Sequence, residues 1–406
     1  MRQFVTGTGY SSGGIHGASS LWHALTTKTS SLVHHPRHSG KQFLCSAPTR
    51  VPLENYPELG RRTRYMDDQV LYATTTALDC AGEMSIRELS SQEYLNPEDI
   101  GVIMGTAFAQ IEFGISQMKK VVSGKPGRIS PRTGMAFYFG SSVGEISSIL
   151  GTKGENCAVT TGSCIGPDAL DIALQTIEKK RNKVVLIGAA EAVPPDLLVD
   201  YCADSLTFCE ETAYEPFCSQ YTGFAPGNGG AVIGVEDPQT ALARGAVPLA
   251  SVTAVGTVNA SRSFLSRDIL IDAEYRKLIT RLIDDAHITF SDIDLIIPTA
   301  DGEPATTNSE LTAITDLFQP TRNLIYTPNP ITGYGISFSV VTNIITALLC
   351  LGHQQVPGLA CAVAEGCEEW FTGNETKDQQ IRNVLILHRS LLGSRISGLI
   401  LSAEDS

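Results

Sequence analysis

Two residues with nucleophilic side chains stand next to each other just before a predicted helix. Ser163 and Cys164 precede the segment 167–180, in which apolar residues recur on one helical stripe and two lysines close the C-terminal end. The dipole and the free backbone N–H groups at a helix N-terminus stabilise an anion. A hydroxyl at this place can therefore in principle be acylated, provided that a base is available.

The sequence offers no evident base for these two residues. Of the eight histidines, none lies between His38 and His287. His353 follows a long apolar helix, and His388 follows a run of four apolar residues, where we expect an ordinary histidine at the end of a strand. Asp301 could serve as a base only if its pKa and its distance suited that role.

The composition excludes several classes of partner. The chain has 406 residues and a net charge of −13, so it lacks the clustered lysines and arginines that neutralise phosphates, and we expect no nucleic-acid partner. An acidic carrier protein would also be repelled by this chain. The positive charge that docks such a carrier should come mainly from another subunit.

The ten cysteines are scattered at irregular intervals, without a Cys-x-x-Cys pair and without a matching histidine spacing. We therefore predict neither a metal centre nor a disulfide framework, and no motif calls for a cofactor. Most of the cysteines lie in apolar runs, where a free thiol behaves as a small buried hydrophobe. This usage favours the reducing cytoplasm.

Short apolar runs such as 184–187 and 295–297 alternate with helical patterns, which predicts an α/β fold with buried sheets. The apolar stretch 336–351 is interrupted by polar residues and is shorter than the roughly 20 residues that span a bilayer. We predict a buried core helix there, and no membrane partner. The N-terminus lacks the apolar segment of a signal peptide. Two halves, 1–245 and 246–406, repeat the order of strands and buried helix.

Four glycine-containing segments follow one another along the chain. They are Val-Thr-Gly-Thr-Gly at 5–9, Thr-Thr-Gly-Ser-Cys-Ile-Gly-Pro-Asp-Ala-Leu at 160–170, Glu-Pro-Phe at 215–217 with Gly-Phe-Ala-Pro-Gly-Asn-Gly-Gly-Ala at 223–231, and Ala-Asp-Gly at 300–302 with Asn-Pro-Ile-Thr-Gly-Tyr-Gly at 329–335. In this order the segments resemble the β-ketoacyl synthase family of the thiolase superfamily. The resemblance implies a thiolase fold, in which two pseudo-repeated halves form a five-layered αβαβα core, and the chemistry of acyl condensation.

The catalytic residues of that family are replaced in this sequence. Ser163 stands at the position of the nucleophilic cysteine, Asp301 and Tyr334 stand at those of the two histidines, and Asn329 replaces the accompanying lysine. Cys164 comes one residue late, and one residue turns a helix by about 100°, so its sulfur should point away from the pocket. A carboxylate at position 301 would repel a developing enolate, and we expect a site without positive or donor character.

The C-terminal glycine loop of the family, whose backbone helps to form the oxyanion hole, corresponds loosely to residues 391–395. Only one glycine, Gly393, remains there. The strained loop geometry is therefore less favoured, which also argues against catalysis.

Loss of these residues within a complete scaffold resembles the chain-length factors, which are the β subunits of type II polyketide synthases. Those proteins carry Ala-Asp-Gly, as this chain does at 300–302, although glutamine commonly stands where this chain has Ser163. The resemblance implies a heterodimer with a catalytic Cys-His-His ketosynthase, contact with an acyl carrier protein mainly through that partner, and a role in polyketide biosynthesis of the aromatic kind.

In that family a helix of the β subunit sets the length of the poly-β-ketone in a tunnel at the interface. The matching residues here are Ile111, Gly114 and Met118, which share one helical face, and Met135. A small Gly114 should leave room for the chain, and Met118 can adapt to several lengths. The alternative is that this stripe simply packs in the core.

Two other functions stay open. One is an acyltransferase or hydrolase that uses Ser163 as its nucleophile. The other is a scaffold or carrier protein that binds an acyl chain, or stabilises an assembly, without setting the length of a polyketide. The sequence does not identify the product, the starter group or the partner subunit.

Overall fold

The computed structural model describes most of the chain, and every structural statement below concerns the residues that it describes. These are residues 2–36, 42–91, 94–193, 199, 208–218, 223–260, 271–320, 322–390 and 395–404.

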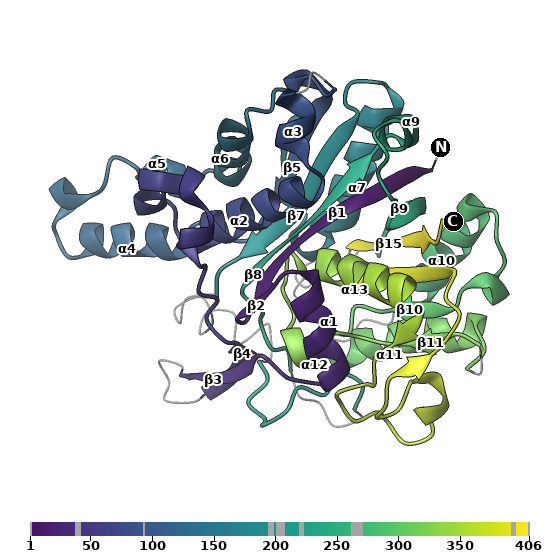
Figure 1. Ribbon diagram of the computed structural model, residues 1–406. Helices are drawn as coiled ribbons and strands as arrows, with labels where there is room; N and C mark the ends of the chain where they lie inside the picture. The colour runs from purple at the N-terminus through teal and green to yellow at the C-terminus, as the bar shows by residue number, and fades with distance from the viewer. Residues whose placement is uncertain are drawn as a thin grey trace.

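Fifteen strands and twelve α-helices of the described chain are labelled in Figure 1 or defined here. The strands are β1 Gln3–Ser12, β2 Ile15–His16, β3 Leu32–Pro36, β4 Gln42–Ser46, β5 Ile100–Gly105, β6 Asn156–Val159, β7 Val184–Glu191, β8 Gly229–Glu236, β9 Ala250–Asn259, β10 Leu295–Ile297, β11 Leu324–Ile325, β12 Gln355–Val356, β13 Lys377–Asp378, β14 Asn383–Arg389 and β15 Arg395–Ser402. The helices are α1 Ala18–Thr27, α2 Asp68–Glu83, α3 Ile86–Ser91, α4 Ile111–Val122, α5 Thr133–Ala136, α6 Ser141–Leu150, α7 Ile165–Glu178, α9 Pro238–Ala243, α10 Asp272–Ala286, α11 Pro304–Leu317, α12 Asn329–Thr332 and α13 Ser339–His353.

The main sheet is a single path of mixed strands in the order β11-β10-β14-β15-β9-β1-β8-β7-β5-β6, with β2 attached to β1. At its centre β1 and β9 pair over only three residue pairs, from Gln3 with Val252 to Val5 with Ala250. This short antiparallel seam separates two groups of strands, β6-β5-β7-β8-β1 and β9-β15-β14-β10-β11. The predicted division of the chain at residues 245 and 246 stays a prediction.

Helices cover both faces of the two strand groups. Helices α2 and α6 pack on the outer face of the first group, and α10 and α11 lie on the outer side of the second. Helices α7 and α13 contact strands of both groups and so form the middle layer. The result is the predicted αβαβα order, with a central layer of two buried helices.

Local sequence explains why these layers can approach each other. Strands β5, β7 and β8 are buried throughout, as expected for strands covered on both faces. Asp67 caps the N-terminus of helix α2, because its carboxylate accepts a hydrogen bond from the Val70 N–H at 3.2 Å. On β1, a Cβ atom at Gly9 would lie 1.9 Å from the Thr76 carbonyl oxygen. Only glycine therefore permits the close contact between β1 and α2.

The long apolar stretch near the C-terminus forms helix α13, which is almost entirely buried, as the sequence predicts. Within the parts of the chain that are described, no helix combines the length and the apolar character needed to cross a bilayer.

One arm extends away from the layered body. Helices α4 and α5 project to one side of the ribbon, beyond α2 and α6 (Figure 1). Seven of the fourteen described residues with exposed large apolar side chains lie on this arm. They are Met118, Val121, Val122, Met135, Phe137, Tyr138 and Phe139.

The end of β7 carries a buried carboxylate that fixes the turn after β5. Glu191 accepts hydrogen bonds from the Thr106 hydroxyl at 3.0 Å and from the Ala107 N–H. Burial raises the pKa of Glu191 from 4.5 to about 7, although hydrogen bonds from Ala107 and its neighbours act in the opposite direction. The folded chain therefore holds this proton to higher pH than the unfolded chain does.

We predict that Glu191→Gln changes how stability depends on pH. The stabilisation from proton uptake by Glu191 is fully present below about pH 4.5 and is lost as the pH rises through about 7. Glutamine keeps the acceptor oxygen and never ionises. Between pH 5 and pH 8 the wild type should therefore lose about 1–3 kcal/mol of unfolding free energy relative to the variant.

Chemical denaturation at four pH values in this range measures that difference. The matched control is Glu98→Gln, because the Glu98 side chain is 65% exposed. If both variants gave the same pH dependence as the wild type, Glu191 would not be protonated in the folded chain.

Candidate functional site

Four residues predicted from the sequence meet at the N-terminal end of the middle-layer helix α7. Ser163 lies in the turn Gly162–Cys164 just before that helix and is buried. Gly162 adopts φ +63°, and a Cβ atom there would lie 2.9 Å from the Ser390 Oγ. The turn that presents Ser163 therefore depends on this glycine.

Asp301 and Asn329 belong to two loops that support each other. Asp301 follows β10, and the Asn329 side-chain amide donates to the carbonyl oxygens of Thr299 at 2.9 Å and Ala300 at 2.8 Å. Ala300 is held at φ +46°, which is unusual for a residue with a Cβ atom. The Asn329 side chain thus holds the Asp301 loop in place. The loop residues Thr299, Ala300 and Asp301 are all buried.

Tyr334 joins these loops to strand β14. Its ring stacks on His388 with 5.6 Å between ring centres and 10° between planes. The Tyr334 hydroxyl lies 3.2 Å from His388 Nε2 and can also donate to the Arg389 carbonyl oxygen at 3.3 Å. The phenol of Tyr334 and the imidazole of His388 are therefore in direct contact.

His388 is the last residue but one of β14, in agreement with the expected histidine at the end of a strand. It is completely buried and contacts Tyr334. Burial first, and then the charge of Arg389, lower the pKa of His388 to about 3. The imidazole is therefore neutral at physiological pH and is a very weak proton acceptor.

The next residue on β14, Arg389, corrects the expectation of a site without positive or donor character. The Arg389 guanidinium forms a buried ion pair with Asp301 and also donates to the Ser390 carbonyl oxygen at 3.1 Å. Burial opposes the charge on Arg389, but Asp301 and its neighbours raise the pKa of Arg389 above its ordinary value. The site therefore keeps a positively charged side chain. The Arg389 charge neutralises the negative charge of Asp301.

A second buried carboxylate supports the Asp301 loop from helix α11. Glu310 accepts hydrogen bonds from the Thr299 N–H at 3.0 Å and the Thr299 hydroxyl at 2.9 Å. Burial raises the pKa of Glu310 to about 7 despite these bonds. Sequence reasoning missed Glu310 and Arg389, and it did not place His388 in the site. A charged residue at the end of an apolar strand is a signal that could have pointed to Arg389.

Cys164 lies beside Ser163 but faces another direction. Its thiol donates to the Arg395 carbonyl oxygen at 3.4 Å, at the start of β15. Burial raises the pKa of Cys164 to about 12, so it stays a thiol rather than the reactive thiolate. The expected orientation away from the pocket agrees with this contact. Residues 391–394, which correspond to the glycine loop, lie outside the described residues.

The predicted gate residues lie on the projecting arm. Ile111 is half-buried and Gly114 is buried on α4, whereas Met118 and Met135 are each 51% exposed. A Cβ atom at Gly114 would lie 2.9 Å from the ring of Phe137, which itself is exposed. The alternative was that this stripe packs in a core. In the isolated chain, the two methionines do not pack in one.

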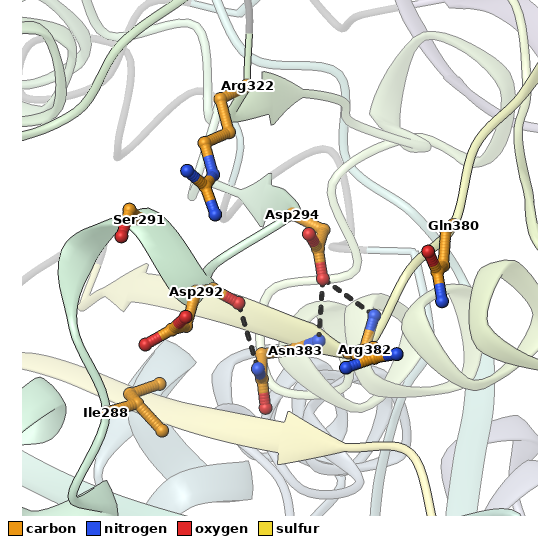
Figure 2. Close-up of a pocket in the computed structure, with 8 residues that line it drawn as sticks. All are labelled: Ile288, Ser291, Asp292, Asp294, Arg322, Gln380, Arg382 and Asn383. Carbon is orange, nitrogen blue, oxygen red and sulfur yellow. Dashed lines mark hydrogen bonds between the residues drawn. The ribbon is translucent and has the colours of Figure 1, made fainter.

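A surface pocket of about 360 Å³ lies away from all of these residues, near the start of β14. Figure 2 shows its lining, in which the Asp294 carboxylate accepts from the backbone N–H groups of Arg382 at 2.7 Å and Asn383 at 3.1 Å. Its polar groups hold β14 against the turn before β10. We therefore interpret it as a structural junction.

The layered core, with a buried turn at the start of its central helix, defines a protein of the thiolase fold. Two family models cover most of the chain: "Beta-ketoacyl synthase, N-terminal domain" matches residues 4–241, and "Beta-ketoacyl synthase, C-terminal domain" matches residues 250–361. The chain belongs to the β-ketoacyl synthase family.

Curated relatives match over most of the chain. A polyketide beta-ketoacyl synthase 2 from Streptomyces halstedii is 27% identical, over 98% of this chain and 97% of the relative. The tetracenomycin polyketide synthase ketoacyl synthase beta subunit from Streptomyces glaucescens is 25% identical, over 79% of this chain and 76% of the relative.

Solved structures share the fold. The structure described as the ishigamide ketosynthase/chain length factor superposes with a TM-score of 0.85 at 18% identity, over 100% of this chain and 99% of that one. A second, described as a type II acyl-carrier protein in complex with its ketosynthase, gives a TM-score of 0.84 at 19% identity, with the same coverage of both chains.

We predict that Asp301→Ala destabilises the protein strongly. Removing one partner leaves the buried Arg389 charge uncompensated, which costs about 3–5 kcal/mol. Urea unfolding measures the loss. The matched control is Glu145→Ala, which removes an exposed ion pair with Arg62 and should cost less than about 1 kcal/mol. Equal losses in the two variants would contradict a special role for the buried pair.

Proposed function

We propose that this protein is a chain-length-factor subunit, which pairs with a Cys-His-His ketosynthase and shapes the tunnel that sets poly-β-ketone length in type II polyketide biosynthesis. The observation that carries the proposal is the state of the nucleophile position. Ser163 stands there in place of the nucleophilic cysteine, the nearby imidazole is neutral, and an Asp301–Arg389 ion pair stands where the family has a catalytic histidine. The condensation chemistry must then come from a partner.

The names of the relatives support a β subunit. The Streptomyces glaucescens relative is a ketoacyl synthase beta subunit, and several others are called beta-ketoacyl synthase 2. One similar structure is named as a ketosynthase/chain length factor. We therefore assign this chain the β role in a heterodimer, in a polyketide pathway of the aromatic kind.

The projecting arm is the surface that we assign to the ketosynthase partner. Its exposed methionines, valines and aromatic residues form an apolar surface of the kind that marks protein interfaces. A positive rim surrounds it, since the stretch 113–144 contains no acidic residue. The basic residues of that stretch are Lys119, Lys120, Lys125, Arg128 and Arg132.

The chain-length gate in this proposal comprises Ile111, Gly114, Met118 and Met135. Gly114 is the critical position because the Phe137 ring lies directly over it. Any side chain at position 114 must displace that ring. The acyl carrier protein would dock mainly on the ketosynthase, since this chain has a net charge of −13.

We place the heterodimer in the cytoplasm. All nine cysteines of the described chain are free, and a reducing compartment keeps them so. No cofactor enters the proposal.

An acyltransferase or hydrolase that uses Ser163 has weaker support. His388 is the residue that could accept a proton through Tyr334, and its lowered pKa opposes that step. A scaffold without any role in chain length would leave the close contact between Gly114 and Phe137 without a function.

The proposal is tested by co-expressing the chain with the ketosynthase encoded in its gene neighbourhood and determining the mass of the purified complex. We expect a stable 1:1 complex that makes polyketide only when both subunits are present. A homodimer that ignores the ketosynthase, or that condenses acyl units alone, would contradict the proposal.

We predict that Gly114→Phe shortens the products by one or more extender units. The new side chain overlaps the position of Phe137 and forces bulk into the interface. Mass spectrometry of the products from the reconstituted heterodimer measures the effect. The matched control is Gly127→Phe on the same arm, because nothing lies within 4 Å of a Cβ atom there. Unchanged products from an intact Gly114→Phe heterodimer would exclude this gate.

We also predict that Val122→Asp weakens pairing with the ketosynthase about tenfold or more, because it places a charge in an apolar interface. Val122 is 86% exposed on the arm, and the matched control Val247→Asp changes a valine that is 81% exposed outside it. Surface plasmon resonance with immobilised ketosynthase compares the two. Equal affinities would show that the arm is not the contact surface.

A further inference from the structure

Helix α4 carries a glycine at a position where another segment supplies the bulk. Gly114 is buried, although it has no side chain of its own to cover it. Outside the helix backbone, the three heavy atoms nearest to a Cβ atom at this position all belong to the Phe137 ring, at 2.9, 3.0 and 3.8 Å. The Phe137 ring therefore occupies the space that a side chain at position 114 would fill.

The same ring is only partly covered by the chain. Phe137 follows the short helix α5 and is 55% exposed, so one part of the ring lies on Gly114 and the rest is open. The open part belongs to the apolar surface that we assign to the ketosynthase. A phenyl ring between a buried helix position and a partner subunit has the size and the apolar character to close a tunnel at their interface.

The neighbouring aromatic residue covers a different glycine. Tyr138 is 64% exposed, and a Cβ atom at Gly140 would lie 2.7 Å from the Cζ atom and from the hydroxyl oxygen of Tyr138. The Tyr138 ring is thus directed at Gly140 rather than at the gate helix. Of these two adjacent rings, only the ring of Phe137 stands in for the missing side chain on α4.

The segment that carries Phe137 is tied to α4 on both sides. Before it, the Ser130 N–H donates to Gln117 Oε1 at 3.0 Å. After it, Gln110 Nε2 donates to the hydroxyl oxygen of Ser141, the first residue of α6, at 3.0 Å. Both glutamines are buried, so loss of either hydrogen bond would leave a buried polar group unpaired. The ring is therefore held in place before a partner binds.

We propose that Phe137, rather than a side chain of α4, is the end wall of the product tunnel and the residue that sets the longest polyketide. The role of Phe137 rests on the proposed function, because only a chain-length factor has such a tunnel to close. A smaller side chain at position 137 leaves space above Gly114, which a longer product can occupy. A larger side chain removes space.

The test compares Phe137→Ala and Phe137→Trp in heterodimers reconstituted with the ketosynthase. Mass spectrometry of the products should show chains that are longer by at least one extender unit for alanine and shorter by at least one for tryptophan. The matched control is Tyr138→Ala, which removes an equally accessible ring from the same arm. We expect it to weaken pairing in surface plasmon resonance about as much as Phe137→Ala does, without changing product length. A residue that only stabilises the interface would not move the length in both directions.

A double variant tests whether positions 114 and 137 share one space. Gly114→Phe alone should shorten the products, because two rings then compete for the same place. In Gly114→Phe combined with Phe137→Ala, the new ring takes the vacated place, and the product length should return to that of the wild type. The two effects are then coupled, as expected for residues in contact. A double variant that still makes the short products of Gly114→Phe would overturn the role of Phe137.

The other outcomes separate the two proposals. Unchanged product length from a paired Phe137→Ala heterodimer overturns the role of Phe137 and leaves the heterodimer and its chain-length function intact. If neither Phe137 variant pairs with the ketosynthase, Phe137 is a pairing residue and its role as the end wall is overturned. A wild-type chain that does not pair at all overturns the proposed function and the role of Phe137 together.

Discussion

A buried charge must be paired, and in this protein that constraint organises the site. The Asp301–Arg389 ion pair connects the loop after β10 to the end of β14, two segments that are 88 residues apart in the chain. Its geometry fixes the Arg389 backbone, whose carbonyl oxygen accepts from Tyr334. The Tyr334 ring then stacks on His388. Pairing of two charges thus helps to fix the positions of two uncharged groups, the Tyr334 phenol and the His388 imidazole.

Most of the fold could be predicted from the sequence, because buried strands and helices leave a direct periodic signal. The runs that become β7, β10 and α13 are recognisable in this way, and the αβαβα order follows from the family resemblance. The positions Ser163, Asp301, Asn329 and Tyr334 were found for a different reason. They were found from their places in the segments that resemble the motifs of the family, and Ser163, Asp301 and Tyr334 also lie next to glycines.

The partners of these residues could not be found in the same way. Arg389 meets Asp301 only after the strands assemble, and an isolated histidine after an apolar run looks the same whether or not it contacts a tyrosine. The sequence therefore predicted an unopposed negative charge at position 301, where the folded chain has a neutralised one. The stripe on α4 also has the periodicity of a core helix, and only the structure reveals that Met118 is exposed.

The place of β1 at the centre of the sheet has a consequence for synthesis on the ribosome. β1 is made first, but it lies between β8 and β9, and the Thr6 hydroxyl bonds Glu236, 230 residues later. At the usual 5–20 residues per second, the ribosome needs roughly ten seconds or more to produce that partner. During this delay β1 has two unpaired edges, which are prone to misassembly. Chaperone demand in producing cells should therefore depend on the first dozen residues more than on the late strands.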